Sequence, residues 1–171
     1  RVLEIGLFSV WVCGTLNCYN FGMKYEIVIE IPKGSDRRIH MKYDGSGFED
    51  FGPIKEKIPI NDGVMPVHYG YIEGIKNSTE KDDVDVLVFS TKQLNTGDRV
   101  NIEVIGIMFR DDNDHKILAK DDTVDTLSFD DLPEAGLVTK YFGYNKQVSF
   151  GDKKQALDYL SSCENSSNVL H

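Results

Sequence analysis

The sequence predicts an α+β fold in which a mostly antiparallel barrel or sheet carries helices at its side. Strand-like alternation of apolar and polar residues occurs in the earlier part of the chain, whereas helix-like patterns begin only near residue 129. Strands that come first and helices that come last are typical of this fold class. A chain of 171 residues has about the length of one domain and buries about two thirds of its extended surface, which is enough for a substantial core.

The first predicted strand covers residues 25–31. Three isoleucines, from Ile27 to Ile31, occur at every second position, so their side chains point to one face of the strand. Glu30 then points to the opposite face. The pattern indicates a strand that is buried on one side.

Three further strands are predicted after this one. The stretches 84–90, 98–109 and 115–120 are rich in valine, isoleucine and leucine. The sequence Asn-Thr-Gly-Asp at 95–98 has the composition of a turn and separates the first two stretches.

Two helices are predicted near the end of the chain. The first lies within residues 129–142, with Asp131 as the expected cap and Pro133 in the first turn. The second lies within residues 151–162, where apolar residues recur at helical spacing up to Leu160. These helices complete the predicted α+β fold.

Composition argues against two classes of function. The chain has 28 acidic and 19 basic residues and a net charge of −9, whereas a nucleic-acid-binding protein needs a basic face. The three cysteines form no Cys-x-x-Cys pair, and the four histidines are scattered. We therefore expect neither a disulfide framework nor a zinc site.

The first 22 residues differ from the rest of the sequence. They are apolar and almost uncharged, and a strand pattern starts directly after Met23, which resembles a natural start. The stretch lacks the features of a signal peptide, and its apolar part is too short to span a membrane. We expect residues 1–22 to be an N-terminal extension outside the functional domain, and that domain to cover residues 23–171. A membrane anchor and an added edge strand are the alternatives.

The first functional signal is the stretch EKDDVDVLVF, which begins with four carboxylates in six positions and continues as a strand. Two like charges about 4 Å apart repel each other by roughly 4 kcal/mol at an effective dielectric constant near 20. Such a group therefore needs protons, cations or separation. The alternation of the strand places Val84 and Val86 on one face and Asp85 on the other.

A second acidic group, FRDDNDHKIL, follows another predicted strand. Asp114 and Lys116 are two positions apart and therefore share a face. If the two strand ends converge, they form a cup of five carboxylates, and hard cations such as Mg²⁺ would neutralise it. Taken alone, each stretch is more simply interpreted as a solvated acidic turn.

Five motifs together resemble the family I soluble inorganic pyrophosphatases. They occur in matching order between residue 25 and about residue 160, and they read EIPKGS, MPVHYGYI, EKDDVDVLVFS, GIMFRDDNDHKILA and DDLPE. The central family pattern, D-x-D-P-x-D-V-L-V, corresponds to residues 80–88. The resemblance implies a five-stranded OB-like antiparallel barrel with flanking C-terminal helices, in agreement with the α+β prediction.

The resemblance also implies the chemistry of the site. Members of this family hydrolyse pyrophosphate with several Mg²⁺ ions per active site, two of which activate the attacking water. Asp82 corresponds to the catalytic residue that accepts the proton of this water. The implied metal ligands are Glu80, Asp85, Asp111, Asp114 and Glu30.

Cationic and phenolic side chains are implied to bind the phosphates. Taken singly, each of the lysines among them is most simply a solvated surface residue, and only its place in the family pattern indicates a function. The implied set is Arg38, Lys57, Tyr69, Lys116, Tyr144 and Lys146, with Lys55 as the alternative to Lys57 and Asn145 as the alternative to Tyr144.

The sequence departs from the family pattern at several of these places. Glu80 replaces an aspartate, and Met65 stands where a phosphate-facing tyrosine is usual. Arg38 and His40 occupy the places of a lysine and a glutamate, unless residues 42–44 are the true counterpart. The arginine that usually precedes the MPVHYGYI motif has no clear match. These changes affect phosphate binding more than metal binding.

We therefore expect a cytoplasmic, Mg²⁺-dependent inorganic pyrophosphatase that forms a homo-oligomer and binds neither nucleic acid nor membrane. One alternative is a hydrolase of another phosphoanhydride on the same fold. The other is a catalytically inactive OB-like binding module, although such a module has no reason to keep mutually repelling carboxylates at two strand ends.

Removal of residues 1–22 is expected to leave a soluble chain with unchanged pyrophosphatase activity, because this segment lies outside the predicted domain. Expression of residues 23–171 and measurement of phosphate release against the full chain test this expectation. An insoluble or inactive product would contradict the predicted domain boundary.

Overall fold

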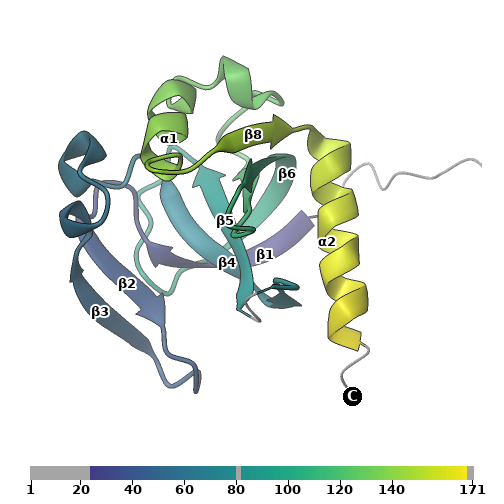
Figure 1. The fold of residues 1–171 in the computed structure, drawn as a ribbon, viewed down its shortest axis with the longest axis horizontal. Coiled ribbons are helices and arrows are strands. Elements are labelled where there is room, and N and C mark those ends of the chain that lie inside the picture. The colour runs from purple at the N-terminus through teal and green to yellow at the C-terminus, as the bar shows by residue number, and fades with distance from the viewer. Residues whose placement is uncertain (1–23, 80–81, 169–171) are drawn as a thin grey trace, which may run out of the picture.

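A computed structural model describes residues 24–79 and 82–168 (Figure 1), so the predicted extension at residues 1–22 lies outside the described residues. The elements follow one another along the chain in the order β1 (Lys24–Ile31), β2 (Arg37–Met41), β3 (Phe48–Pro53), η1 (Ile54–Glu56), η2 (Ile60–Gly63), β4 (His68–Lys76), β5 (Asp83–Phe89), β6 (Arg99–Arg110), β7 (Lys116–Lys120), η3 (Phe129–Asp131), α1 (Ala135–Phe142), β8 (Val148–Gly151) and α2 (Lys153–Asn168).

Five strands close into a barrel, and the predicted fold class is confirmed. The strands neighbour one another in the order β1-β4-β5-β7-β6, and the pairing of β1 with β6 closes the ring. Strand β8 extends the sheet by pairing with β6. One pair differs from an all-antiparallel barrel, because β5 and β7 run parallel to each other. The long strand β6 pairs with three strands, β1, β7 and β8, and therefore holds the barrel together.

Alternation along the strands divides the apolar side chains between two cores. In β5, Val84, Val86 and Val88 belong to a first core, which α2 continues with Ala156 and Leu160. Leu87 and Phe89 of the same strand belong to a second core, which α1 continues with Val138 and Tyr141. Both faces of β5 are therefore buried, and a slip of one residue would turn Asp85 toward the first core, so the register of this strand is fixed.

Strands β2, β3, β4 and β8 were not among the predicted strands. The hairpin of β2 and β3 forms a separate two-stranded sheet beside the barrel (Figure 1). Its residues are only partly buried, so the alternation of apolar residues that marks the barrel strands is absent. Strand β4 contains a glycine at Gly70 and another at Gly74, which weaken the strand pattern in the sequence.

The two predicted helices are confirmed, with a correction to the first. Helix α1 begins only at Ala135, after the short helix η3, and Glu134 rather than Asp131 stands at its cap position. Pro133 lies between the two helices and lacks the N–H that a continuous helix would need. Helix α2 is preceded by a reciprocal pair of hydrogen bonds between Asp152 and Gln155, which satisfies its first turn. In the described part of the chain, no helix combines the length and the apolar character needed to cross a membrane.

Gly70 marks a close approach between strands β1 and β4. A Cβ atom at this position would lie 2.2 Å from the carbonyl oxygen of Val28. We expect Gly70→Ala to lower the free energy of unfolding by about 1–3 kcal/mol, because backbone must shift to admit the methyl group.

Chemical denaturation measures this change, and Gly136→Ala is the matched control. Gly136 lies in helix α1, and its added Cβ meets no atom within 4 Å. This control is expected to be neutral or to stabilise the protein by up to about 1 kcal/mol. Equal stabilities of the two variants would contradict the close approach at Gly70.

Candidate active site

The centre of the site is an ammonium group between two carboxylates at the start of strands β5 and β7. These strands pair in parallel with Val86 opposite Ile117, so the preceding residues, Asp85 and Lys116, are neighbours. The Lys116 ammonium contacts the Asp85 carboxylate and lies 2.7 Å from that of Asp114. Asp85 of the first acidic stretch and Asp114 of the second therefore converge on one lysine. We call Asp85, Asp114, Lys116 and the adjacent Tyr69 the Lys116 cluster.

Tyr69 closes the cluster on the side of strand β4. Its hydroxyl lies 3.5 Å from the Lys116 Nζ atom, and its ring centre lies 5.4 Å from the same atom. The ring stacks on Phe142, at the end of helix α1, with 6.2 Å between the ring centres. Burial raises the pKa of Tyr69 well above its usual value, and the nearby carboxylates raise it further. Tyr69 is therefore a neutral phenol that can donate a hydrogen bond to an anion.

The charges of the cluster depend on one another. Only 3% of the Lys116 side chain is exposed. Burial lowers the pKa of Lys116, but Asp85 and Asp114 outweigh this effect, so its pKa is raised and the lysine stays charged. Burial raises the pKa of Asp85 to about 6 against the opposing effect of Lys116. For Asp114, Lys116 and Arg110 outweigh burial and lower the pKa.

A second group of charges surrounds Asp112 in the turn between β6 and β7. The Arg110 guanidinium donates two hydrogen bonds to this carboxylate, from Nε to Oδ1 at 3.2 Å and from Nη2 to Oδ2 at 2.7 Å. The Lys146 ammonium lies 3.3 Å from Asp112 Oδ2. Arg110 Nη1 also lies 3.9 Å from Asp114 Oδ2, which connects this group to the Lys116 cluster.

Glu30 is buried and its two carboxylate oxygens are both engaged. Oε1 accepts a hydrogen bond from the backbone N–H of Met41 at 2.6 Å, and Oε2 lies 3.1 Å from Nδ1 of His40. The His40 ring also meets the Tyr69 ring edge to face, with 6.0 Å between the ring centres. Glu30 and His40 therefore adjoin the Lys116 cluster through Tyr69.

Besides Lys116 and Lys146, the cations that were predicted to bind phosphate are Arg38 and Lys57. Of these two, Arg38 lies near His40. Its guanidinium lies 5.9 Å from the centre of the half-exposed Phe51 ring, which itself contacts His40. Lys57 follows the short helix η1, is exposed, and makes no side-chain hydrogen bond or ion pair within the described residues. Its alternative, Lys55, forms an ion pair with Asp62.

Several predicted residues stay outside these contacts. Glu80 lies outside the described residues. Asp82 and Asp111 are exposed, and neither side chain forms a hydrogen bond or ion pair with the residues that the structure describes. Tyr144 is half-buried and its side chain likewise has no such partner, whereas Asn145 has a φ of 56° and serves as a turn residue. Met65 is buried in the second core.

Within residues 24–79 and 82–168, no group of three or more histidine, cysteine, aspartate or glutamate side chains is arranged to hold a metal ion. Asp85, Asp112, Asp114 and Glu30 are instead bonded to protein cations or backbone donors. The sequence analysis missed Arg110 and Asp112, although their place beside Asp114 in a tight turn between two strands was a usable signal.

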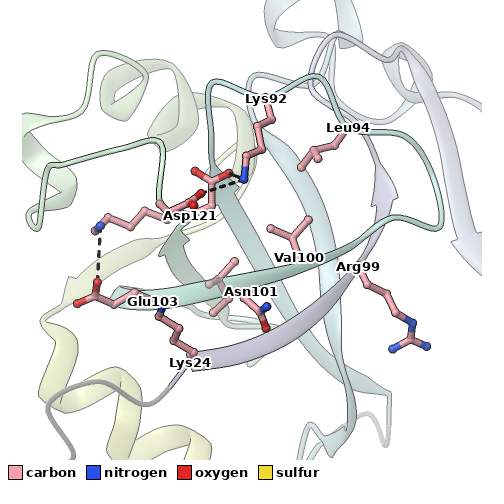
Figure 2. Close-up of a pocket in the computed structure, with 11 residues that line it drawn as sticks. Lys24, Lys92, Leu94, Arg99, Val100, Asn101, Glu103 and Asp121 are labelled. Atoms are coloured by element: carbon pink, nitrogen blue, oxygen red, sulfur yellow. Dashed lines mark hydrogen bonds and ion pairs between the residues drawn. The ribbon is translucent and has the colours of Figure 1, made fainter.

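The structure also has a hollow of about 550 Å³ away from the Lys116 cluster (Figure 2). It lies at the opposite end of β7, where Lys120 and Asp121 form its wall. Its charges are paired with one another, for example Lys92 with Asp122 at 2.9 Å and Lys120 with Glu103 at 3.6 Å. Asp85, Asp114 and Lys116 are not among the residues that line this hollow.

The closed barrel, with cation-bridged carboxylates at its strand ends, places the chain in the class of OB-like barrel proteins. The family model for inorganic pyrophosphatase matches residues 27–170, and the chain belongs to this family. The resemblance drawn from the five motifs is thus confirmed.

Individual relatives agree with this assignment. The chain is similar to an inorganic pyrophosphatase of Sulfolobus acidocaldarius, with 31% identity over 137 residues that cover 73% of this chain and 75% of the relative. Among solved structures, the pyrophosphatase of Neisseria gonorrhoeae has a TM-score of 0.68 at 24% identity and covers 84% of this chain and 90% of its own. The pyrophosphatase of Ehrlichia chaffeensis has a TM-score of 0.70 at 22% identity, and the match covers 82% of this chain and 92% of that protein. The two structures share the fold of this chain.

Replacement of Lys116 by methionine is expected to destabilise the protein most at alkaline pH. Loss of the ammonium raises the pKa of Asp85 above its present value of about 6. When the pKa of a carboxyl group is higher in the folded than in the unfolded state, the free energy of unfolding of the protein falls as the pH rises through the folded pKa. The free energy of unfolding should therefore fall by about 3–5 kcal/mol at pH 8, and by less at pH 5.

Denaturation in EDTA at the two pH values tests this prediction. Lys154→Met is the control, because Lys154 and Asp158 form an exposed ion pair on helix α2. The control should change stability little at either pH. A cost of Lys116→Met that is the same at pH 5 and pH 8 would contradict the electrostatic coupling.

Proposed function

We propose that this protein hydrolyses inorganic pyrophosphate to two phosphates, that the reaction depends on Mg²⁺, and that it takes place in the cytoplasm. The observation that carries the proposal is the Lys116 cluster. In a chain of the inorganic pyrophosphatase family, it joins the carboxylates and the lysine of the two motifs that were implied to bind metal and phosphate.

The side chains around the cluster fit Mg²⁺ by their chemistry, since all of the proposed ligands offer carboxylate oxygens, which this hard cation prefers. Asp85 and Asp114 reach the same ammonium and so point toward one position. We assign them as ligands, with Glu80 and Asp111 as further ones. Glu30 would act through water, because both of its oxygens already accept hydrogen bonds. When bound, Mg²⁺ lowers the pKa of water and neutralises the charge of the substrate.

The proton acceptor in this proposal is Asp82. Its carboxylate is exposed, lies at the entry to β5, and has no partner among the described side chains. Asp114, by contrast, is engaged by Lys116 and Arg110, which lower its pKa and make it a poorer proton acceptor. Asp82 is therefore better suited than Asp114 to take the proton of the attacking water.

The phosphate-binding side is formed by donors around the same carboxylates. Lys116 carries a fixed positive charge, Tyr69 is a neutral hydrogen-bond donor, and Lys146 lies beside Asp112. Arg38 lies in strand β2, with its guanidinium beside the Phe51 ring. These groups would hold the substrate and stabilise the charge that develops on the leaving phosphate.

A phosphoanhydride with an organic group is a second candidate substrate, and Phe51 is the observation that favours it. This ring is 50% exposed, lies beside Arg38 and His40, and connects to the cluster through Tyr69. An exposed aromatic ring next to a guanidinium is able to stack on a nucleobase. A nucleoside triphosphate is therefore the informative second substrate in any assay.

We expect Asp82→Asn to lower kcat for pyrophosphate by about 100-fold or more, because the amide cannot accept the proton of the attacking water. Folding should not change, since the Asp82 side chain is exposed. Phosphate release from pyrophosphate is measured with Mg²⁺, with EDTA, and with a nucleoside triphosphate in place of pyrophosphate.

Asp158→Asn on helix α2 is the matched control, because this aspartate is exposed and forms an ion pair with Lys154 on the helix surface. It should have the activity of the unmodified protein. Absence of EDTA-sensitive release from pyrophosphate by the unmodified protein would overturn the proposed function. Full activity of Asp82→Asn would overturn only the role of Asp82.

A further inference from the structure

We propose that Arg110 binds a phosphate group of the substrate and that Asp112 holds the place of this phosphate until substrate arrives. The inference rests on the proposed function, because it concerns the same site. It assigns a guanidinium to substrate binding in a chain whose sequence shows no clear counterpart of the arginine usual in the family.

The first support is the geometry of the pair. The guanidinium faces Asp112 side on, and two N–H groups reach the two oxygens of one carboxylate at 3.2 and 2.7 Å. Arginine binds phosphate oxygens with the same fork of two parallel hydrogen bonds. Lys146 completes the arrangement by approaching Oδ2 from another element at 3.3 Å. Two cations from separate segments therefore converge on one anionic group, as they would on a phosphate.

The second support is the position of Arg110 relative to the Lys116 cluster. Its Nη1 atom lies 3.9 Å from Asp114 Oδ2, while the other oxygen of Asp114 lies 2.7 Å from Lys116 Nζ. A single carboxylate thus separates the guanidinium from the ammonium. Because pyrophosphate carries two linked phosphates, Lys116 and Arg110 are suitably placed to bind one each.

The third support is the limited freedom of the arginine. Only 13% of its side chain is exposed, and its backbone N–H donates to Nδ1 of His115 at 3.0 Å. The residue is also fixed by the pairing of Arg110 with Val148 in strands β6 and β8. A guanidinium held in this way loses little conformational entropy when it changes from one anionic partner to another.

The lysines that the sequence analysis offered for this role are placed less favourably. Lys57 has no partner within the described part of the chain, and Lys55 is held by Asp62 beside the helix η2. Neither contacts the Lys116 cluster. Arg110 is the cation that the described contacts connect to it through Asp114.

The test uses two substitutions that break the same pair with opposite expected effects. Arg110→Gln should weaken binding of imidodiphosphate, a pyrophosphate analogue that resists hydrolysis, by about tenfold or more, because a bidentate charged contact is lost. Asp112→Asn should leave binding unchanged or make it severalfold tighter, since the competing carboxylate is gone. Calorimetry in EDTA measures this affinity without metal, and KM for pyrophosphate in Mg²⁺ is the second readout if the metal-free affinity is too weak to titrate.

Arg99→Gln is the control, because Arg99 forms comparable ion pairs with Glu26 and Glu73 on the barrel surface. It should change neither affinity nor KM. Unchanged affinity and KM of Arg110→Gln would overturn the inference, and so would an equal loss in Arg110→Gln and Asp112→Asn, since that is the result of a purely structural ion pair. Failure of the unmodified protein to hydrolyse pyrophosphate would instead overturn the proposed function.

Discussion

The site depends on one interaction, the buried contact of the Lys116 ammonium with the carboxylates of Asp85 and Asp114. Two partly buried carboxylates repel each other more strongly than they would in water, and partial removal of water penalises each charge separately. The lysine is charged because the two aspartates outweigh the effect of burial, and Asp114 is charged because the lysine and Arg110 are near. Strands β5 and β7 must therefore pair with the register observed, since any slip would leave a buried charge without a partner.

The same principle extends outward from the Lys116 cluster. Asp112 is bonded to Arg110 and Lys146, and Glu30 is bonded to His40 and to a backbone N–H. Among the described residues, Asp85, Asp112 and Asp114 are thus tolerated close together because protein cations lie between them.

Features with strong periodicity could be predicted from the sequence, and those that depend on long-range contacts could not. The barrel strands β1, β5 and β6 alternate clearly because each contributes to a buried core, whereas the hairpin of β2 and β3 is half exposed and lacks this alternation. From the sequence, Asp114 and Lys116 could be placed on one face, whereas the convergence of the two strand ends could be stated only as a condition. The pairing of Arg110 with Asp112 requires the exact course of the turn after β6, and Lys146 reaches it from a distant segment.

The balance of charges also constrains how a substrate can enter. A pyrophosphate ion brings several negative charges to a group of residues that is already rich in carboxylates, so binding must either add cations or release cations from their present partners. Added Mg²⁺ meets the first condition at Asp85 and Asp114, where the cation between the two carboxylates, Lys116, is deeply buried. Arg110 and Lys146 are able to meet the second, because their partner Asp112 is 29% exposed and can be rehydrated when it is displaced. The cations differ in the same sense, because 3% of the Lys116 side chain is exposed against 13% of Arg110 and 35% of Lys146. Lys116 therefore stays with its carboxylates, whereas Arg110 and Lys146 are able to turn from Asp112 to the substrate.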